Sequence, residues 1–361
     1  AHGGVLTWDT SIAADGIITA GTGTWQNGAG NWNNGTTSSG INWNNATPDV
    51  ATFAGTDGNY AITVGGAITC GTPLTFANDG YTLSAASPQT ITIAGTVAVA
   101  SGKTAIIGTN VNLLRSGGAW TLSGPGTLNL SGSVSNNSAT AASIGSGITV
   151  NVLAGGSLYC GSSIQVSSAS GGATVNVNGG SVTVGGSGNM IVNSSSSGSA
   201  TMTLANGGSV STLSTGAGAF RFGTSGGSAV FNLDGGTLTT AKLYEGAVAV
   251  LSTNNFNGGI LKAVSGTTAG ATFLTGLDCA NVRNGGAVLD ANGQNITIGQ
   301  ALLHSTISGD NGIDGGLTTV GNGGGTVTLT GVNTYTGPTT INGSNTLAIV
   351  APYSTLGSSV L

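Results

Sequence analysis

Apolar and polar residues alternate along much of this chain, which is the pattern of strands with one buried and one solvated face. In TVNVNGGSVTV (Thr174–Val184) the four valines fall on one side of the predicted strands. The same alternation is found in VFNLDGGTL (Val230–Leu238). Thr, Val and Ile favour strands, whereas Gly, Asn and Ser favour turns. The pattern therefore predicts an all-β chain with frequent tight turns.

One turn recurs between these strands. Asn or Asp is followed by two glycines, a small residue and Val or Leu, as in NGGSV, DGGTL and NGGIL; AGGSL and NGGAV are looser copies. The second glycines of the six copies are Gly156, Gly180, Gly208, Gly236, Gly259 and Gly286. They recur with a period of about 23–28 residues, which is within the range of solenoid repeats. We predict that the Asn and Gly residues of these turns supply corner conformations with positive φ, which they adopt at low steric cost.

The constant spacing decides between two folds. Asn-Gly between alternating strands usually forms a hairpin, which would give a meander or a sandwich. A hairpin protein has no reason to repeat one turn at a fixed period, whereas a solenoid returns the chain to the same corner on every coil. We therefore predict a right-handed parallel β-helix with coils of about 23–28 residues.

The N-terminal segment differs from the rest, and we predict residues 1–55 as a Trp- and Asn-rich cap or assembly segment and residues 56–361 as the β-helix. Four of the five tryptophans lie here: Trp8, Trp25, Trp32 and Trp43. A solenoid end exposes an open core, which large aromatic residues close well. The alternatives are an assembly contact and a platform for sugars.

The C-terminal end has no evident cap. It finishes NTLAIVAPYSTLGSSVL, which is still apolar and strand-like. An uncapped β-helix end is either continued by further residues or paired with another molecule. Tyr353, Leu356 and Leu361 are therefore candidates for an assembly contact, together with the tryptophans.

The chain carries little charge. It has 361 residues with 67 glycines, 5% charged residues and a net charge of −5, whereas a soluble domain is about 25% charged. The six basic residues are scattered, so nucleic acid is a poor partner. No apolar run is long enough for a membrane helix, and membrane insertion is not expected. The start AHGGVLTW fits cleavage by signal peptidase and hence secretion, although a boundary introduced by cloning would look the same.

The three cysteines, Cys70, Cys160 and Cys279, are far apart in the sequence. We interpret them as buried thiols, with one disulfide between stacked coils as the alternative. No Cys-x-x-Cys or Cys/His cluster indicates a metal site, and no cofactor is expected.

The segment GGGTVTLTGVNTYTGPTTINGSNTLAIV (Gly323–Val350) resembles the autotransporter-associated β-strand repeat of bacterial surface proteins. The residues on that pattern are Gly325, Thr326, Thr328, Leu329, Gly331, Asn333, Thr334, Tyr335, Gly337, Thr339, Thr340, Ile341 and Leu347. Pro338 replaces the usual second glycine, and Gly343–Thr346 adds residues before the last strand. The N-terminal pattern W…GNW…NW…PDVATFAG is similar to the opening of large proteins that carry this repeat.

The resemblance implies a secreted or surface-exposed right-handed β-helix that is structural or adhesive. The repeat carries no catalytic residues, so none are transferred to this chain. Within the repeat, we expect Ile341, Leu347 and Ile349 to enter the core and Tyr335 and Pro338 to shape a corner.

An enzymatic function is an alternative, because β-helices also degrade polysaccharides, and a catalytic site would need charged residues. The candidates for such a site are Lys242, Glu245, Lys262, Asp278, Arg283, Asp290, His304, Asp310 and Asp314. SGDNGIDGG (Ser308–Gly316) lacks the Asp spacing and closing Glu of an EF-hand, so we interpret it as a solvated turn. The enzyme would require Arg283, Asp290, Asp310 and Asp314 to share one groove.

The sequence thus predicts a non-enzymatic, secreted structural protein. Its coils would associate end to end, head to tail with copies of itself, into an extracellular fibre or surface layer. The alternative is a surface adhesin that binds glycans or host surfaces, and a polysaccharide-degrading enzyme is a minor alternative.

Overall fold

The computed structural model describes residues 3–11, 13, 15–35, 40–115, 117–145, 147–168, 170–213, 219–246, 251–266, 271–321, 323–350 and 356. These residues form strands and no helix. The chain divides into two compact units, Ala1–Gly161 and Ser162–Leu361. Within each unit nearly every strand pairs in parallel with the strand one coil away, in three sheets called A, B and C here. Each unit is therefore a β-solenoid, which confirms the predicted fold class.

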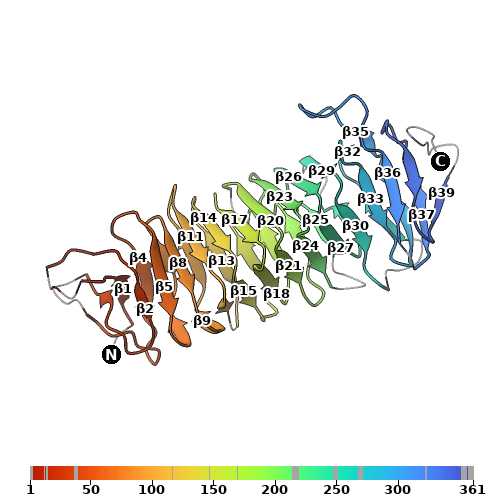
Figure 1. Cartoon of the computed structure of the whole chain (residues 1–361). Helices are drawn as coiled ribbons and strands as arrows, with labels where there is room; N and C mark the ends of the chain where they lie inside the picture. The colour runs from red at the N-terminus through yellow and green to blue at the C-terminus, as the bar shows by residue number, and fades with distance from the viewer. Residues whose placement is uncertain are drawn as a thin grey trace. The chain divides into compact units, whose positions relative to one another are not determined.

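The first unit winds from sheet A to B to C and back (Figure 1). Its strands in sheet A are, in order, β3 (Trp32–Asn33), β1 (Val5–Trp8), β4 (Val50–Phe53), β7 (Leu74–Phe76), β10 (Thr96–Val99), β13 (Trp120–Ser123) and β16 (Ala142–Ile144). Those in sheet B are β2 (Gly23–Trp25), β5 (Tyr60–Val64), β8 (Tyr81–Ser84), β11 (Thr104–Ile107), β14 (Thr127–Leu130) and β17 (Thr149–Leu153). Those in sheet C are β6 (Ile68–Cys70), β9 (Gln89–Ile93), β12 (Val111–Arg115), β15 (Ser133–Asn136) and β18 (Ser157–Cys160).

Strand alternation builds the core of this unit. In sheet C, Ile91, Leu113, Val134 and Leu158 pair in register from coil to coil and are all buried. Their neighbours along each strand point outward and are partly exposed. Burying such a side chain contributes roughly 1.5–3 kcal/mol relative to leaving it exposed. The predicted alternation of buried and wet positions is thus the packing rule of the solenoid.

The N-terminal segment makes the first coil unusually long. Val5 in β1 pairs with Val50 in β4, whereas in the next coil Thr52 pairs with Thr75. The extra length holds β2 and also β3, which turns back and pairs with β1 antiparallel. The predicted cap segment therefore contributes strands to sheets A and B.

The second unit repeats the three-sheet winding (Figure 1). Its strands in sheet A are β19 (Ile164–Val166), β22 (Met190–Val192), β25 (Phe220–Phe222), β28 (Leu243–Glu245), β31 (Ala271–Thr275), β34 (Asn295–Ile298), β37 (Thr326–Leu329) and β39 (Thr346–Ile349). Those in sheet B are β20 (Ala173–Asn178), β23 (Ser199–Ala205), β26 (Ser228–Asp234), β29 (Leu251–Phe256), β32 (Cys279–Val282) and β35 (Leu303–His304). Those in sheet C are β21 (Ser181–Val184), β24 (Ser209–Thr212), β27 (Thr237–Thr240), β30 (Ile260–Ala263), β33 (Ala287–Asp290), β36 (Leu317–Val320) and β38 (Thr339–Ile341).

The register of sheet C follows the period predicted from the turn glycines. One buried column runs through this sheet and consists of Val182, Val210, Leu238, Leu261 and Leu289. Sheet A departs from the period, because Met190 pairs with Phe220, a wider separation in the sequence than any step of that column. The period therefore holds at the recurrent turn, and longer connections are accommodated elsewhere in the coil.

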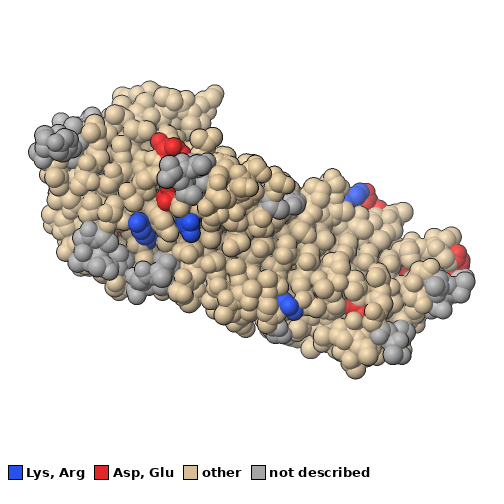
Figure 2. Space-filling view, turned by 180° about the vertical axis from the view of Figure 1, so that it is seen from behind, with Lys and Arg blue, Asp and Glu red and all other residues tan. Residues whose placement is uncertain are grey.

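Outside, stacked polar side chains bond to one another. Asn281 donates its amide to Asn255 at 2.8 Å, Asn255 donates to Asn232 at 2.8 Å, and Asn232 donates to Thr203 at 3.2 Å. These residues occupy one outward column of sheet B. A few charged side chains interrupt the uncharged face shown in Figure 2. Stacking at about 4.8 Å per coil disfavours a column of like charges, and amides avoid that cost.

Candidate functional site

The six turn glycines lie at one corner of the coil, where sheet B leads into sheet C. Positive φ belongs mainly to the first glycine of each pair: Gly155, Gly179, Gly207, Gly235 and Gly258, with φ between 74° and 95°. In the last copy it belongs to the second, Gly286, with φ of 78°. Glycine therefore supplies a positive φ at every copy of the turn, as predicted, and Asn206 also has a positive φ, of 50°.

The second glycine has a different requirement. A Cβ added to Gly156 would lie 2.1 Å from the carbonyl oxygen of Leu130, and one added to Gly236 would lie 2.5 Å from that of Gly208. Both oxygens belong to the preceding coil. The second glycine is therefore needed because consecutive corners approach backbone to backbone, and the turn motif serves stacking.

The four N-terminal tryptophans form one buried cluster with Phe53. Trp25 and Trp43 have ring centroids 5.0 Å apart, and Trp8 and Trp32 have centroids 5.2 Å apart. All four side chains are at most 1% exposed. Trp8 donates its indole N–H to the carbonyl of Gly21, and Trp43 donates to Asn45. The ring faces meet other aromatic rings, so they are not available as a platform for sugars.

In the second unit, no described residue covers the outer side of the coil that ends at Val350. In sheet A, Val327 and Leu329 are fully buried, whereas their partners one coil on, Leu347 and Ile349, are partly exposed, Ile349 at 44%. In sheet C, Ile341 continues the inward column of buried Thr319 but is 43% exposed. The side chains of Ile341, Leu347 and Ile349 thus lie on the inward side of their strands, as predicted, but no described residue packs over them.

The outer side of this coil also presents strand edges. β39 is the last described strand of sheet A and β38 the last of sheet C. Their outer N–H and C=O groups have no strand beside them within the described ranges. Tyr335 is buried, and its hydroxyl lies 2.7 Å from that of Thr339, so the corner beneath is packed. We call this surface, made by Ile341, Leu347, Ile349 and the edges of β38 and β39, the open coil end.

Of the other C-terminal candidates, Tyr353 and Leu361 lie outside the described residues. Leu356 is described and is partly exposed.

Several of the charged residues considered for an enzymatic site form ion pairs with a nearby residue instead. Arg283 donates two hydrogen bonds to Asp310, from Nε at 2.9 Å and from Nη2 at 3.0 Å, and Ser305 donates its hydroxyl to the same carboxylate. These bonds hold the pKa of Asp310 below its usual value. Asp290 instead pairs with Lys262 at 3.1 Å. The structure therefore joins Arg283 to Asp310 and places Asp290 in a different ion pair.

Asp314 stabilises the last described coil through hydrogen bonds to its backbone. Its carboxylate accepts hydrogen bonds from the N–H groups of Thr336 at 2.8 Å, Gly337 at 2.8 Å and Gly316 at 2.9 Å. His304 Nδ1 lies 2.8 Å from the same carboxylate. Burial raises the pKa of Asp314, but these hydrogen bonds outweigh it, and the pKa lies below its usual value. The group acts as a structural anchor.

Among the described residues, no group of three or more His, Cys, Asp or Glu side chains could hold a metal ion. Cys70 and Cys160 are buried, Cys279 is partly exposed, and none of the three forms a disulfide. Burial raises the pKa of Cys70 to about 12. The alternative of a disulfide between coils is therefore not observed. Within the described part of the chain, no helix has the length and apolarity needed to span a membrane.

Comparison with known proteins identifies no relative. No protein-family model matches the chain, and no curated protein and no solved structure is similar to it.

Proposed function

We propose that this chain is a non-enzymatic structural protein that builds an extracellular fibre or surface layer, by end-to-end association of its solenoid with other copies. The observation that carries the proposal is the open coil end. Ile341, Leu347 and Ile349 sit at core positions that no described coil follows, and two strand edges beside them are unpaired within the described ranges. Such edges are templates for pairing with another chain.

A second copy is a suitable occupant for two reasons. Its N-terminal end is built from the same three sheets, which end there at β3, β2 and β6. The outer side of β3 is already paired with Ile41, so the strand edges that could receive another copy are those of β2 and β6. In addition, no charged residue follows Asp314 in the sequence, so copies approaching through this end do not repel one another there. A contact between two different surfaces that does not close into a ring produces filaments.

We also propose that the protein is secreted and that it is related to the proteins that carry the autotransporter-associated repeat. The segment Gly323–Val350 supports the resemblance, and secretion is proposed because that repeat occurs in bacterial surface proteins. A low-charge exterior of Thr, Ser and Asn is compatible with lateral packing of such fibres.

The test is to place a charge in the open coil end. We expect Ile349→Asp to abolish assembly seen by negative-stain electron microscopy and to raise the dissociation constant of self-association at least about 100-fold, because a buried unpaired carboxylate costs several kcal/mol. Leu213→Asp is the matched control, since Leu213 is exposed outside this end. Wild-type protein that stays monomeric at high concentration, or a variant that assembles like the wild type, contradicts the proposal.

A further inference from the structure

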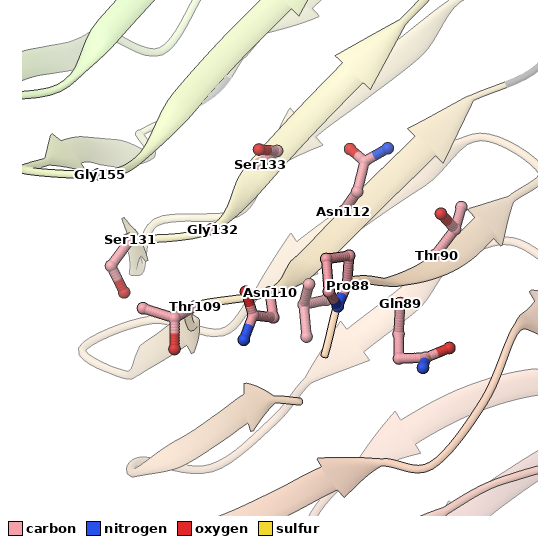
Figure 3. A pocket seen from close by; sticks show the side chains of 11 residues that line it. Pro88, Gln89, Thr90, Thr109, Asn110, Asn112, Ser131, Gly132, Ser133 and Gly155 are labelled. Carbon is pink, nitrogen blue, oxygen red and sulfur yellow. The ribbon is translucent and has the colours of Figure 1, made fainter. Parts of the chain in front are cut away.

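A hollow is present in the first unit at the corner between sheets B and C (Figure 3). Its volume is about 530 Å³. Residues 88 to 90, 109 to 112, 131 to 133 and 155 line it, from four successive coils. A volume of about 300–1,000 Å³ is typical of sites for small ligands.

Unequal corner lengths create the hollow. The corners from sheet B to C contain residues 85–88, 108–110, 131–132 and 154–156, so the third is shorter than its neighbours on both sides. Gly132 lets this short corner sink against the preceding coil. A Cβ there would lie 2.2 Å from the carbonyl oxygen of Gly108. The coil at Ser131–Gly132 is therefore recessed between longer corners.

The lining is polar and uncharged. Figure 3 shows Thr90, Asn112 and Ser133 along the strands, and Thr109, Asn110 and Ser131 along the corners. Asn112 accepts a hydrogen bond from Ser135 through its carbonyl oxygen, and within the described residues its amide N–H₂ has no acceptor. The hydroxyls of Thr90 and Thr109 likewise have no partner among the described residues. Donors and acceptors thus repeat at about 4.8 Å along the hollow.

This chemistry excludes several ligands. No Lys, Arg or His lines the hollow, so phosphate and nucleic acid have no counter-charge there. A peptide that adds as a strand needs a free edge. β9 and β12 are paired on both sides, by β6 and β12 and by β9 and β15 respectively.

We propose that this hollow binds a neutral oligosaccharide. Sugar hydroxyls both donate and accept, which suits a row of side-chain amides and hydroxyls without formal charge. The ring of Pro88 provides an apolar surface for the C–H groups of one sugar unit. The site lies in the first unit and is independent of the open coil end.

The test is saturation-transfer NMR on the full chain with neutral hexasaccharides of glucose, xylose, mannose and N-acetylglucosamine, and with oligogalacturonate as the acidic probe. We expect at least one neutral probe to bind. Thr109→Trp fills the hollow and should weaken that binding at least about tenfold. Thr90→Val removes one hydroxyl and should weaken it about two- to tenfold, the worth of one hydrogen bond.

Two matched controls accompany these variants. Ser101→Trp places the same ring on an exposed corner outside the hollow, and Thr127→Val removes a hydroxyl on sheet B. Both should bind like the wild type, and thermal melting should show that all four variants are folded. The proposal is overturned if no neutral probe binds, if only oligogalacturonate binds, or if Thr109→Trp binds as well as Ser101→Trp.

Discussion

At the residue scale, the paired glycines divide two tasks. The first allows the chain to turn with positive φ, which costs a residue with a side chain roughly 1–2 kcal/mol. The second leaves room for the carbonyl oxygen of the preceding coil. The motif and its spacing were readable in the sequence, because glycine pairs stand out against alternating strands. The division of tasks was not, because the second requirement depends on a neighbouring coil that is distant in the sequence.

Gly236 tests this division. Its φ is not positive, and an added Cβ would lie 2.5 Å from the carbonyl oxygen of Gly208. We expect Gly236→Ala to lower the free energy of unfolding by about 2 kcal/mol through overpacking. In Gly312→Ala, where a Cβ meets nothing within 4 Å, stability should stay within about 0.5 kcal/mol of the wild type. Denaturant unfolding measures both, and equal stabilities would show that the corners tolerate a side chain.

At the scale of elements, alternation predicts most strands and fails in one informative case. β29 (Leu251–Phe256) reads LSTNNF, and its inward residues Ser252 and Asn254 are fully buried. Hydropathy alone assigns both to the surface. Register decides otherwise, because Asn254 pairs between Phe231 and Ala280 in an inward column. The hollow at Ser131–Gly132 was equally unpredictable, since it arises from differences in corner length between separate coils.

The anchoring of the last coil through Asp314 predicts a dependence on pH. The folded-state pKa of Asp314 is lowered, so its contribution to stability is present above the unfolded value of about 3.9 and is lost as pH falls through the folded-state pKa. We expect the amides of Thr336 and Gly337 to lose protection from hydrogen exchange below about pH 4. Asp314→Asn should cause the same loss at neutral pH, equivalent to about 3 kcal/mol of local stability.

Asp234→Asn is the control for that experiment, because the carboxylate of Asp234 accepts a hydrogen bond from the side-chain amide of Asn257. This variant should leave protection at Thr336 unchanged. If Asp314→Asn also leaves it unchanged, the last coil is held by its strand pairing alone.

At the scale of the whole molecule, the two ends differ in a way that their compositions foreshadow. The tryptophans gather at the start, where they fill the interior of a long first coil. The last charged residue is Asp314, and the coil after it places apolar side chains at positions that no described residue covers. The composition indicated that the ends differ. Which end has its aromatic side chains buried, and which has apolar side chains that no described residue covers, depends on strand registers that composition does not contain.

The uncharged open coil end predicts how association responds to salt. Contacts between charges weaken as the Debye length falls from about 10 Å at 0.1 M to about 3 Å at 1 M, whereas burial of apolar groups is strengthened by sulfate. We expect the self-association constant, measured by sedimentation, to change less than about threefold between these concentrations of sodium chloride and to rise in sodium sulfate. A fall of tenfold or more in sodium chloride would place the contact on charged residues, and hence away from Ile341, Leu347 and Ile349.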